Sequence, residues 1–167
     1  MIKLDYIHTM ARYNAWQNQS VLDAADGLDD AARNLDRGAF FGSIRGTLSH
    51  LLWGDQTWMH RFSDSPAPAV SAIAASPDMV VDWGELKVQR AAVDQAILQW
   101  ADGLDSAWLE TDLTWFSGAA KREVTKPAGF LVVHFFNHQT HHRGQVHAML
   151  TAAGVKPEDT DLFFLKR

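Results

Sequence analysis

The sequence predicts an all-α protein, a four-helix bundle with a long crossover between the second and third helices. Apolar residues recur at helical spacing in four separate segments. The stretch 63–81, between the second and third segments, holds three of the five prolines among Ser and Ala, a composition that breaks helices and is typical of a long connection. The chain has 167 residues, 47% of them hydrophobic, which suits one domain over residues 1–167 with a single core.

The first two helices are predicted by apolar patterning and one capping residue. Two apolar stripes between Leu4 and Leu28 indicate a first helix that is buried on two sides. Ser43 is a suitable N-cap for a second helix that continues to about Phe62, because a serine hydroxyl can accept a hydrogen bond from a first-turn amide. This prediction places His50 on the second helix.

The third and fourth helices also carry terminal signals. Asp82, followed three residues later by Glu85, resembles a capping box, and helical spacing continues from there to Gly103. Pro127 fits the first turn of a fourth helix, where backbone amides lack partners in any case, and the pattern ends at about Ala153.

A small β-ribbon is predicted directly before the fourth helix. Segments 113–116 and 122–125 are rich in strand-forming residues and flank Ser117 and Gly118, which suit a turn. A plain loop is the alternative interpretation of this stretch.

Composition excludes several classes of function. The formal net charge is −5 and the sequence has no cluster of Lys and Arg, so we expect no nucleic-acid partner and no anionic-membrane partner. The absence of cysteine excludes disulfides, thiolate ligands and a cysteine nucleophile. The first sixteen residues lack the apolar region of a signal peptide and no run is long enough to span a membrane, so we expect a cytoplasmic protein that acts on a small molecule.

Histidines are concentrated on the predicted fourth helix, which contains five of the eight: His134, His138, His141, His142 and His147. His138 and His142 are one turn apart, so their side chains lie one above the other and can share an ion. His134 is one further turn back on the same stripe and His141 is about 60° away, so geometry alone does not select the pair.

A third ligand has to come from another helix, and His50 is the best candidate because it lies on a predicted bundle helix. Three neutral imidazoles suit a divalent transition metal such as zinc, nickel, copper or iron. Three ligands also leave a coordination position open, as in catalytic metal sites. The alternative is that these are ordinary buried or half-exposed histidines.

At these residues the sequence resembles the DinB/YfiT-like family. The resemblance is carried by TLSHL at 47–51 and NHQTHHRGQ at 137–145. It is supported by YNAW at 13–16, by Trp58 with Arg61 and Phe62, and by DLFFL at 161–165, and it extends over nearly the whole chain. It implies a four-helix bundle, often a homodimer, with a divalent metal on His50, His138 and His142. The resemblance thus selects His138 and His142 from the histidines of the fourth helix, a choice that their spacing alone leaves open.

The family is diverse in activity, and several members resemble transferases or isomerases that use a low-molecular-weight thiol such as bacillithiol, mycothiol or glutathione. The resemblance therefore implies a metal-dependent transferase that conjugates such a thiol to a small electrophile. A bound metal would stabilise the thiolate that this cysteine-free chain cannot supply. A metal-dependent hydrolase and a non-catalytic metal-binding protein of the stress response are the alternatives.

Other polar residues near the motifs carry weaker expectations, and no residue is assigned a catalytic role. Gln145 and His141 are candidates for hydrogen bonds to a metal ligand or a substrate. Arg143 points away from the histidine stripe and is expected to contact another helix, and Gly144 is expected to permit close helix approach. Asp55 lies in an apolar sector and needs a partner, either Arg61 or another arginine.

Overall fold

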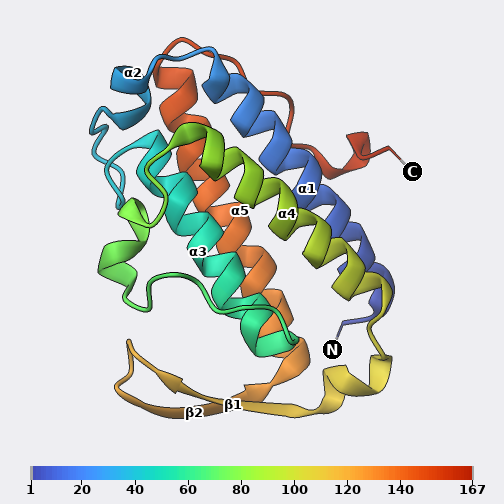
Figure 1. Cartoon of the computed structure of the whole chain (residues 1–167). Helices are drawn as coiled ribbons and strands as arrows, with labels where there is room; N and C mark the ends of the chain where they lie inside the picture. The colour runs from blue at the N-terminus through green and yellow to red at the C-terminus, as the bar shows by residue number, and fades with distance from the viewer. Residues whose placement is uncertain (1, 167) are drawn as a thin grey trace.

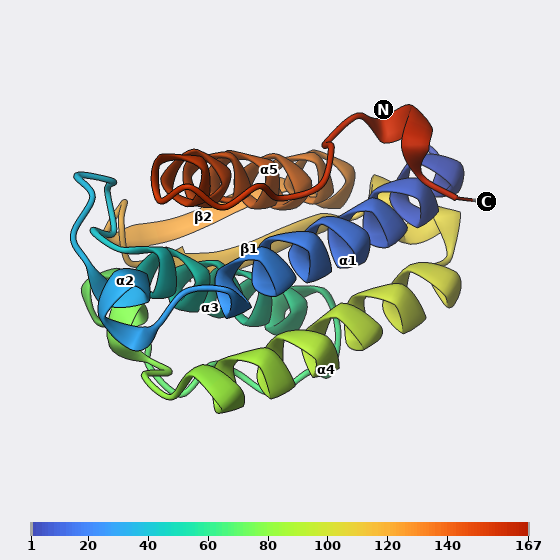
Figure 2. The ribbon, with the colours of Figure 1, turned by 90° about the horizontal axis from the view of Figure 1, so that it is seen from above.

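The computed structural model describes residues 2–166, and four long helices form its bundle: α1 (Leu4–Asp26), α3 (Ile44–Phe62), α4 (Trp83–Asp102) and α5 (Ala128–Ala152) (Figure 1). In Figure 2, seen from above, α4 and α5 lie on opposite sides with α1 and α3 between them. Accordingly α1 packs on both α4 and α5, and α3 packs on the same two helices. The four-helix bundle predicted from the sequence is confirmed.

Shorter elements connect these helices. They are α2 (Asp30–Asn34), the 3-10 helices η1 (Ile73–Asp78), η2 (Ser106–Glu110) and η3 (Leu162–Phe164), and the strands β1 (Asp112–Ser117) and β2 (Arg122–Pro127). The crossover between α3 and α4 contains η1, which packs against α3. Neither α2 nor any 3-10 helix is predicted by the apolar pattern, since each is too short to show helical periodicity.

Two predicted helix starts are confirmed by their caps. The Ser43 hydroxyl accepts a hydrogen bond from the Gly46 amide (3.0 Å), and an Asp82 carboxylate oxygen accepts one from the Glu85 amide (2.7 Å). The position predicted for Pro127 is wrong by one residue. Pro127 ends β2 and precedes α5, because it still pairs with Asp112 in the ribbon and has an extended ψ of 136°.

The predicted β-ribbon is confirmed over the plain loop. β1 and β2 pair antiparallel, from Asp112 opposite Pro127 to Ser117 opposite Arg122. Residues of β1 alternate between exposed and half-buried, and the half-buried Trp115 packs on the core. The ribbon lies across the end of the bundle where α3 ends and α5 begins (Figure 1).

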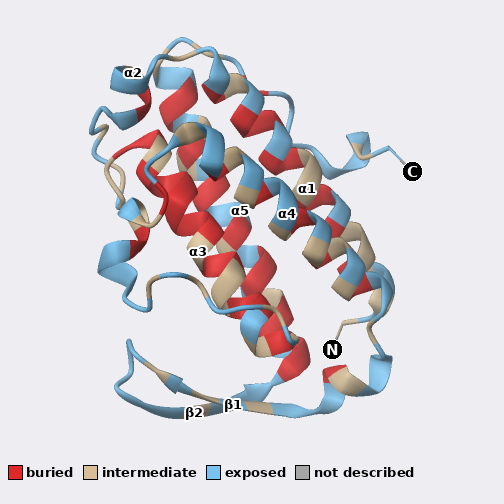
Figure 3. Ribbon diagram, in the orientation of Figure 1, coloured by how far each residue is buried: buried red, intermediate tan, exposed pale blue. Residues whose placement is uncertain are grey.

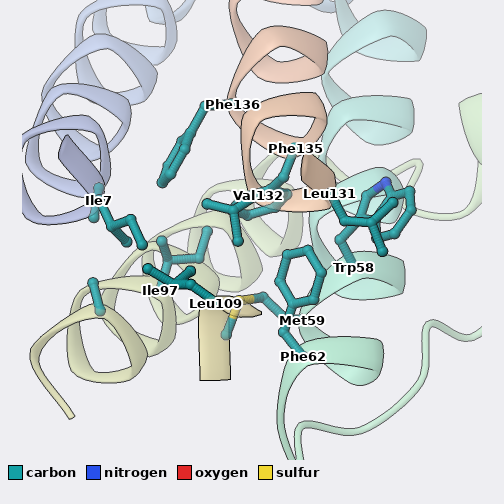
Figure 4. Packing of buried hydrophobic residues seen from close by; sticks show 12 residues of the cluster. Ile7, Trp58, Met59, Phe62, Ile97, Leu109, Leu131, Val132, Phe135 and Phe136 are labelled. Carbon is teal, nitrogen blue, oxygen red and sulfur yellow. The ribbon is translucent and has the colours of Figure 1, made fainter. Parts of the chain in front are cut away.

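The buried residues of the long helices lie mainly on the sides that face the other helices (Figure 3). The apolar ones form two clusters. Figure 4 shows the cluster nearer the ribbon, where Phe62 and Met59 of α3 meet Ile97 of α4 and Val132 and Phe135 of α5. The second cluster includes Val21, Leu52, Leu86, Val146 and Leu150. Each cluster draws residues from all four long helices, so both belong to one bundle.

A buried polar layer also connects the four helices. Asp55 of α3 is fully buried, and one of its oxygens pairs with Nη1 of Arg90 on α4 (2.7 Å). Its other oxygen accepts from the Gln139 amide of α5 (3.0 Å). The partner of Asp55 is therefore Arg90, and the alternative, Arg61, is wrong.

The same layer continues to α1. Arg90 also pairs with Asp94 (2.9 Å), which accepts from the Asn18 amide of α1 (2.8 Å). Arg143 of α5 donates to the side-chain oxygens of Asn14 and Asn18, so the expected contact with another helix is confirmed. With two arginines and two aspartates, the layer is electrically neutral.

Gly144 does not have the role expected from the sequence. A methyl group placed on it would meet no atom within 4 Å outside its own helix, so it permits no close helix approach. That expectation is wrong because Gly144 lies on the exposed face of α5.

Candidate metal centre

Three histidines converge where α3 packs against α5. His50 comes from α3, and His138 and His142 come from α5, with one ring nitrogen from each within 4.8 Å of the others. The centroids of the His138 and His142 rings are 4.5 Å apart, as their one-turn spacing predicts, and the His50 ring lies 4.7 Å from His142 and 5.3 Å from His138. These three side chains can hold a metal ion.

Hydrogen bonds outside the group orient two of the rings. The Ser76 hydroxyl donates its proton to the Ile73 carbonyl (2.6 Å), so it accepts from Nδ1 of His50 at 2.7 Å. The side-chain oxygen of Gln145 accepts from Nδ1 of His142 at 2.8 Å. Both bonds place the proton on Nδ1 and leave Nε2 with the lone pair that a metal requires.

The third ring, His138, presents its Nε2 to the same point. This nitrogen lies 3.3 Å from Nε2 of His50. Two nitrogens bound to one ion at about 2.0–2.1 Å, with a tetrahedral angle between them, are about 3.3–3.4 Å apart. The pair therefore fits a single ion, whereas without an ion the Nε2 proton of His138 would donate to His50. Nδ1 of His138 is buried and has no partner among residues 2–166.

Gly54 makes room for His138. A methyl group on Gly54 would lie 2.6 Å from Cε1 of the His138 ring, closer than Cβ atoms approach other atoms in folded proteins, and 3.2 Å from Nδ1, which is also tight. The His138 imidazole therefore lies directly against the backbone of α3. Gly54, and not Gly144, is the glycine that the arrangement of α3 and α5 requires.

Burial keeps the group uncharged. Desolvation, followed by repulsion from His142, lowers the pKa of His50 to about 3, and desolvation with the surrounding histidines lowers the pKa of His138 to about 3. Burial also lowers the pKa of His142. All three imidazoles are neutral at pH 7, which is the form that ligates metal ions.

Two aromatic rings stack on His50. Phe41, in the segment between α2 and α3, stacks on the His50 ring with centroids 3.7 Å apart, and Trp53 stacks at 5.4 Å. The Trp53 indole donates to the carbonyl of Val70 in the crossover (2.7 Å). Neither Phe41 nor Ser76 was identified from the sequence, because both lie in irregular segments where no periodicity shows which side chains point inward.

The remaining predicted histidines lie outside the group. His141 is exposed, and its ring contacts His142 at 4.9 Å without joining the three ligand atoms. The His134 ring lies 6.1 Å from His138 and 5.1 Å from Trp58. His147 lines a separate cavity between α1 and α5.

Within residues 2–166 no helix combines the length and the apolar character that crossing a membrane requires.

Comparisons with known proteins agree with this structure. The sequence model of the DinB family matches residues 1–167. The protein DinB of Bacillus subtilis (strain 168) is 26% identical over 163 residues, which cover 94% of this chain and 91% of that protein. The fold resembles the crystal structure of a DinB-like protein from Bacillus cereus ATCC 10987, with a TM-score of 0.50 and 16% identity over 86% of this chain and 89% of the other. Since the family model spans the entire sequence, this chain belongs to the DinB family.

Proposed function

We propose that His50, His138 and His142 bind one divalent transition metal ion, zinc, nickel or iron, and that this centre transfers a low-molecular-weight thiol to a small electrophile. The observation that carries the metal proposal is the convergence of three neutral imidazoles on one point, two of them held by Ser76 and Gln145 in the tautomer that binds metals. Three protein ligands leave a position for an exogenous group.

The thiol proposal rests on the chemistry that this centre and chain can provide together. A metal ion with an open position lowers the pKa of a thiol that ligates it and so supplies a thiolate at neutral pH. The chain contains no cysteine, so the sulfur nucleophile has to come from a small molecule. Phe41 and Trp53 stack on the buried His50 ring, so the surroundings of this ligand are apolar.

A hydrolase is less well supported because the group offers no general base. The cluster of ligand atoms consists of histidines alone among the described residues, 2–166. Asp55 is the buried carboxylate nearest to His50 in the sequence, and both of its oxygens already accept hydrogen bonds, one from Arg90 and one from Gln139. A water molecule at the open position would therefore find no general base within the ligand cluster and none in Asp55.

Elemental analysis of protein purified without chelators tests the metal proposal. We expect one equivalent of metal in the wild type, loss of it in His138→Ala, and full retention in His147→Ala, which alters a histidine of α5 outside the group. Protein that takes up no divalent metal, or that binds it equally well as His138→Ala, would refute the site.

Thiol binding is tested on the metal-loaded protein with bacillithiol, mycothiol and glutathione in turn. Conjugation of a bound thiol to a model electrophile should disappear with the metal and return when it is restored. Metal-loaded protein that binds none of these thiols would contradict the transferase proposal and leave the non-catalytic alternative.

A further inference from the structure

A row of side chains leads from the metal centre along the line where α3 packs against α5. The ring of His134 lies one turn from His138 on α5, with centroids 6.1 Å apart. Trp58 of α3 meets His134 edge to face at 5.1 Å. The Arg61 guanidinium lies over the Trp58 ring, 4.5 Å from its centroid. Consecutive contacts thus connect His138 to a cationic group.

The geometry of α3 directs this cation toward the centre. Gly54, which touches His138, and Arg61 are seven residues apart, so they lie on the same face of α3 with an axial separation of about 10.5 Å. Trp58 is between them. Because its guanidinium lies over Trp58, the Arg61 side chain is folded back along the helix toward the histidines.

Arg61 is held in place by aromatic rings and not by an acid. Its guanidinium lies 4.5 Å from the ring centroid of Trp58 and 5.5 Å from that of Trp115 on β1. No carboxylate within residues 2–166 forms an ion pair with it, although the protein has a net charge of −5. Three other arginines have acidic partners, since Arg33 pairs with Asp30, Arg45 with Asp78 and Arg90 with Asp55. The remaining arginines of the described residues form no ion pair either, and what distinguishes Arg61 is that its guanidinium lies over two indole rings.

An uncompensated, half-buried guanidinium on rigid aromatic supports is suited to bind an anion. Burial lowers the pKa of Arg61, yet a guanidinium remains charged at neutral pH. Its planar fork matches a carboxylate and can donate two parallel hydrogen bonds to it. The exposed His134 beside Trp58 offers a further ring nitrogen along the same path.

We propose that Arg61, supported by Trp58 and Trp115, binds the carboxylate of the metal centre's substrate, so that this substrate is an organic anion long enough to reach from the histidines to the end of α3. This inference rests on the proposed function, because Arg61 would bind the carboxylate end of a ligand whose thiol end is bound to the metal.

The test uses cobalt-loaded protein and ω-mercaptocarboxylates, with their primary amides as neutral controls, in a series of chain lengths that brackets the axial separation of Gly54 and Arg61. Thiol binding is measured from the sulfur-to-cobalt absorption. At one chain length the wild type should bind the carboxylate at least about tenfold more tightly than the amide. Arg61→Gln should reduce that ratio to within about twofold. Arg12→Gln, an equal loss of charge on α1, should preserve it.

The outcomes separate the two proposals. Neutral thiols that bind equally well to wild type and Arg61→Gln, with no carboxylate preference at any length, would overturn the subsite and leave the metal–thiol proposal intact. A preference that persists in Arg61→Gln would also overturn it. Failure of every thiol to bind the cobalt-loaded wild type would overturn the proposed function itself. Arg61→Lys keeps the positive charge but not the planar pair of donors, so its ratio of carboxylate to amide affinity should lie between those of the wild type and Arg61→Gln. This second variant tests the subsite even if Arg61→Gln fails to fold.

Discussion

Gly54→Ala should weaken metal binding while changing the stability of the fold only slightly. The added methyl group would lie 2.6 Å from Cε1 of His138, 0.8 Å less than the 3.4 Å at which ordinary van der Waals contact begins. Metal–ligand distances tolerate only about 0.2 Å, so a ring displaced this far leaves the ligand position. We expect metal affinity to fall by at least about 10–100-fold, the range seen when a ligand's supporting contacts are removed.

The effect on folding should be much smaller because two contributions oppose each other. Alanine in a helix interior is more favourable than glycine by about 0.5–1 kcal/mol, whereas overpacking costs about 1–3 kcal/mol. Without metal, the free energy of unfolding of Gly54→Ala should therefore differ from that of the wild type by no more than about 1–2 kcal/mol.

The assay is a competition titration with a chromophoric chelator, together with urea unfolding in the presence of a chelator. Gly144→Ala is the matched control, since the same substitution on α5 meets open space and should leave metal affinity unchanged. Wild-type metal affinity in Gly54→Ala would show that His138 is not held against α3 as described.

Three further predictions concern the ligands and the buried charges. Gln145→Ala removes the acceptor of the His142 proton and should weaken metal binding by about 10–100-fold in the same titration, so an unchanged affinity would show that this bond does not orient the ring. In the folded state the pKa values of His50 and His138 are lowered from 6.5 to about 3. Between these two pH values the unfolded state therefore binds more protons than the folded state. The metal-free protein should lose stability as the pH falls from about 6.5 toward 3, by at most about 1.4 kcal/mol per pH unit for each histidine. Urea unfolding at several pH values measures this slope, and a flat profile below 6.5 would contradict it. Asp55→Ala leaves Arg90 buried beside one acid in place of two and should cost about 3–5 kcal/mol in urea unfolding, whereas a loss under 1 kcal/mol would show that the pair is not effectively buried.

The sequence was sufficient for features that depend on local periodicity. Helical spacing and capping residues predicted the four long helices, including the starts at Ser43 and Asp82. The one-turn spacing of His138 and His142 similarly predicted that their rings lie together. These predictions succeeded because the positions of residues along one helix follow from its geometry alone.

Features that depend on contacts between distant segments could not be predicted in this way. The choice of Arg90 as the partner of Asp55 follows from how α3 packs against α4, which spacing along α3 does not reveal. Ser76 reaches His50 from an irregular crossover. Gly54 does carry a local signal of its role, since an isolated glycine inside an apolar helix often marks a close packing contact.

The buried polar layer has a consequence for how His50, His138 and His142 are brought together. The Asp55–Gln139 hydrogen bond lies one residue along each helix from the contact between Gly54 and His138. Sliding α3 past α5 by one turn, about 5.4 Å, would break that bond and leave charged groups unpaired in the core. The layer thus fixes the position of α3 along α5 and keeps His50 opposite His138 in the metal-free fold. If the three histidines bind an ion as proposed, ligands assembled in advance would lose little conformational entropy on binding, and the ion could enter and leave while the bundle stays folded.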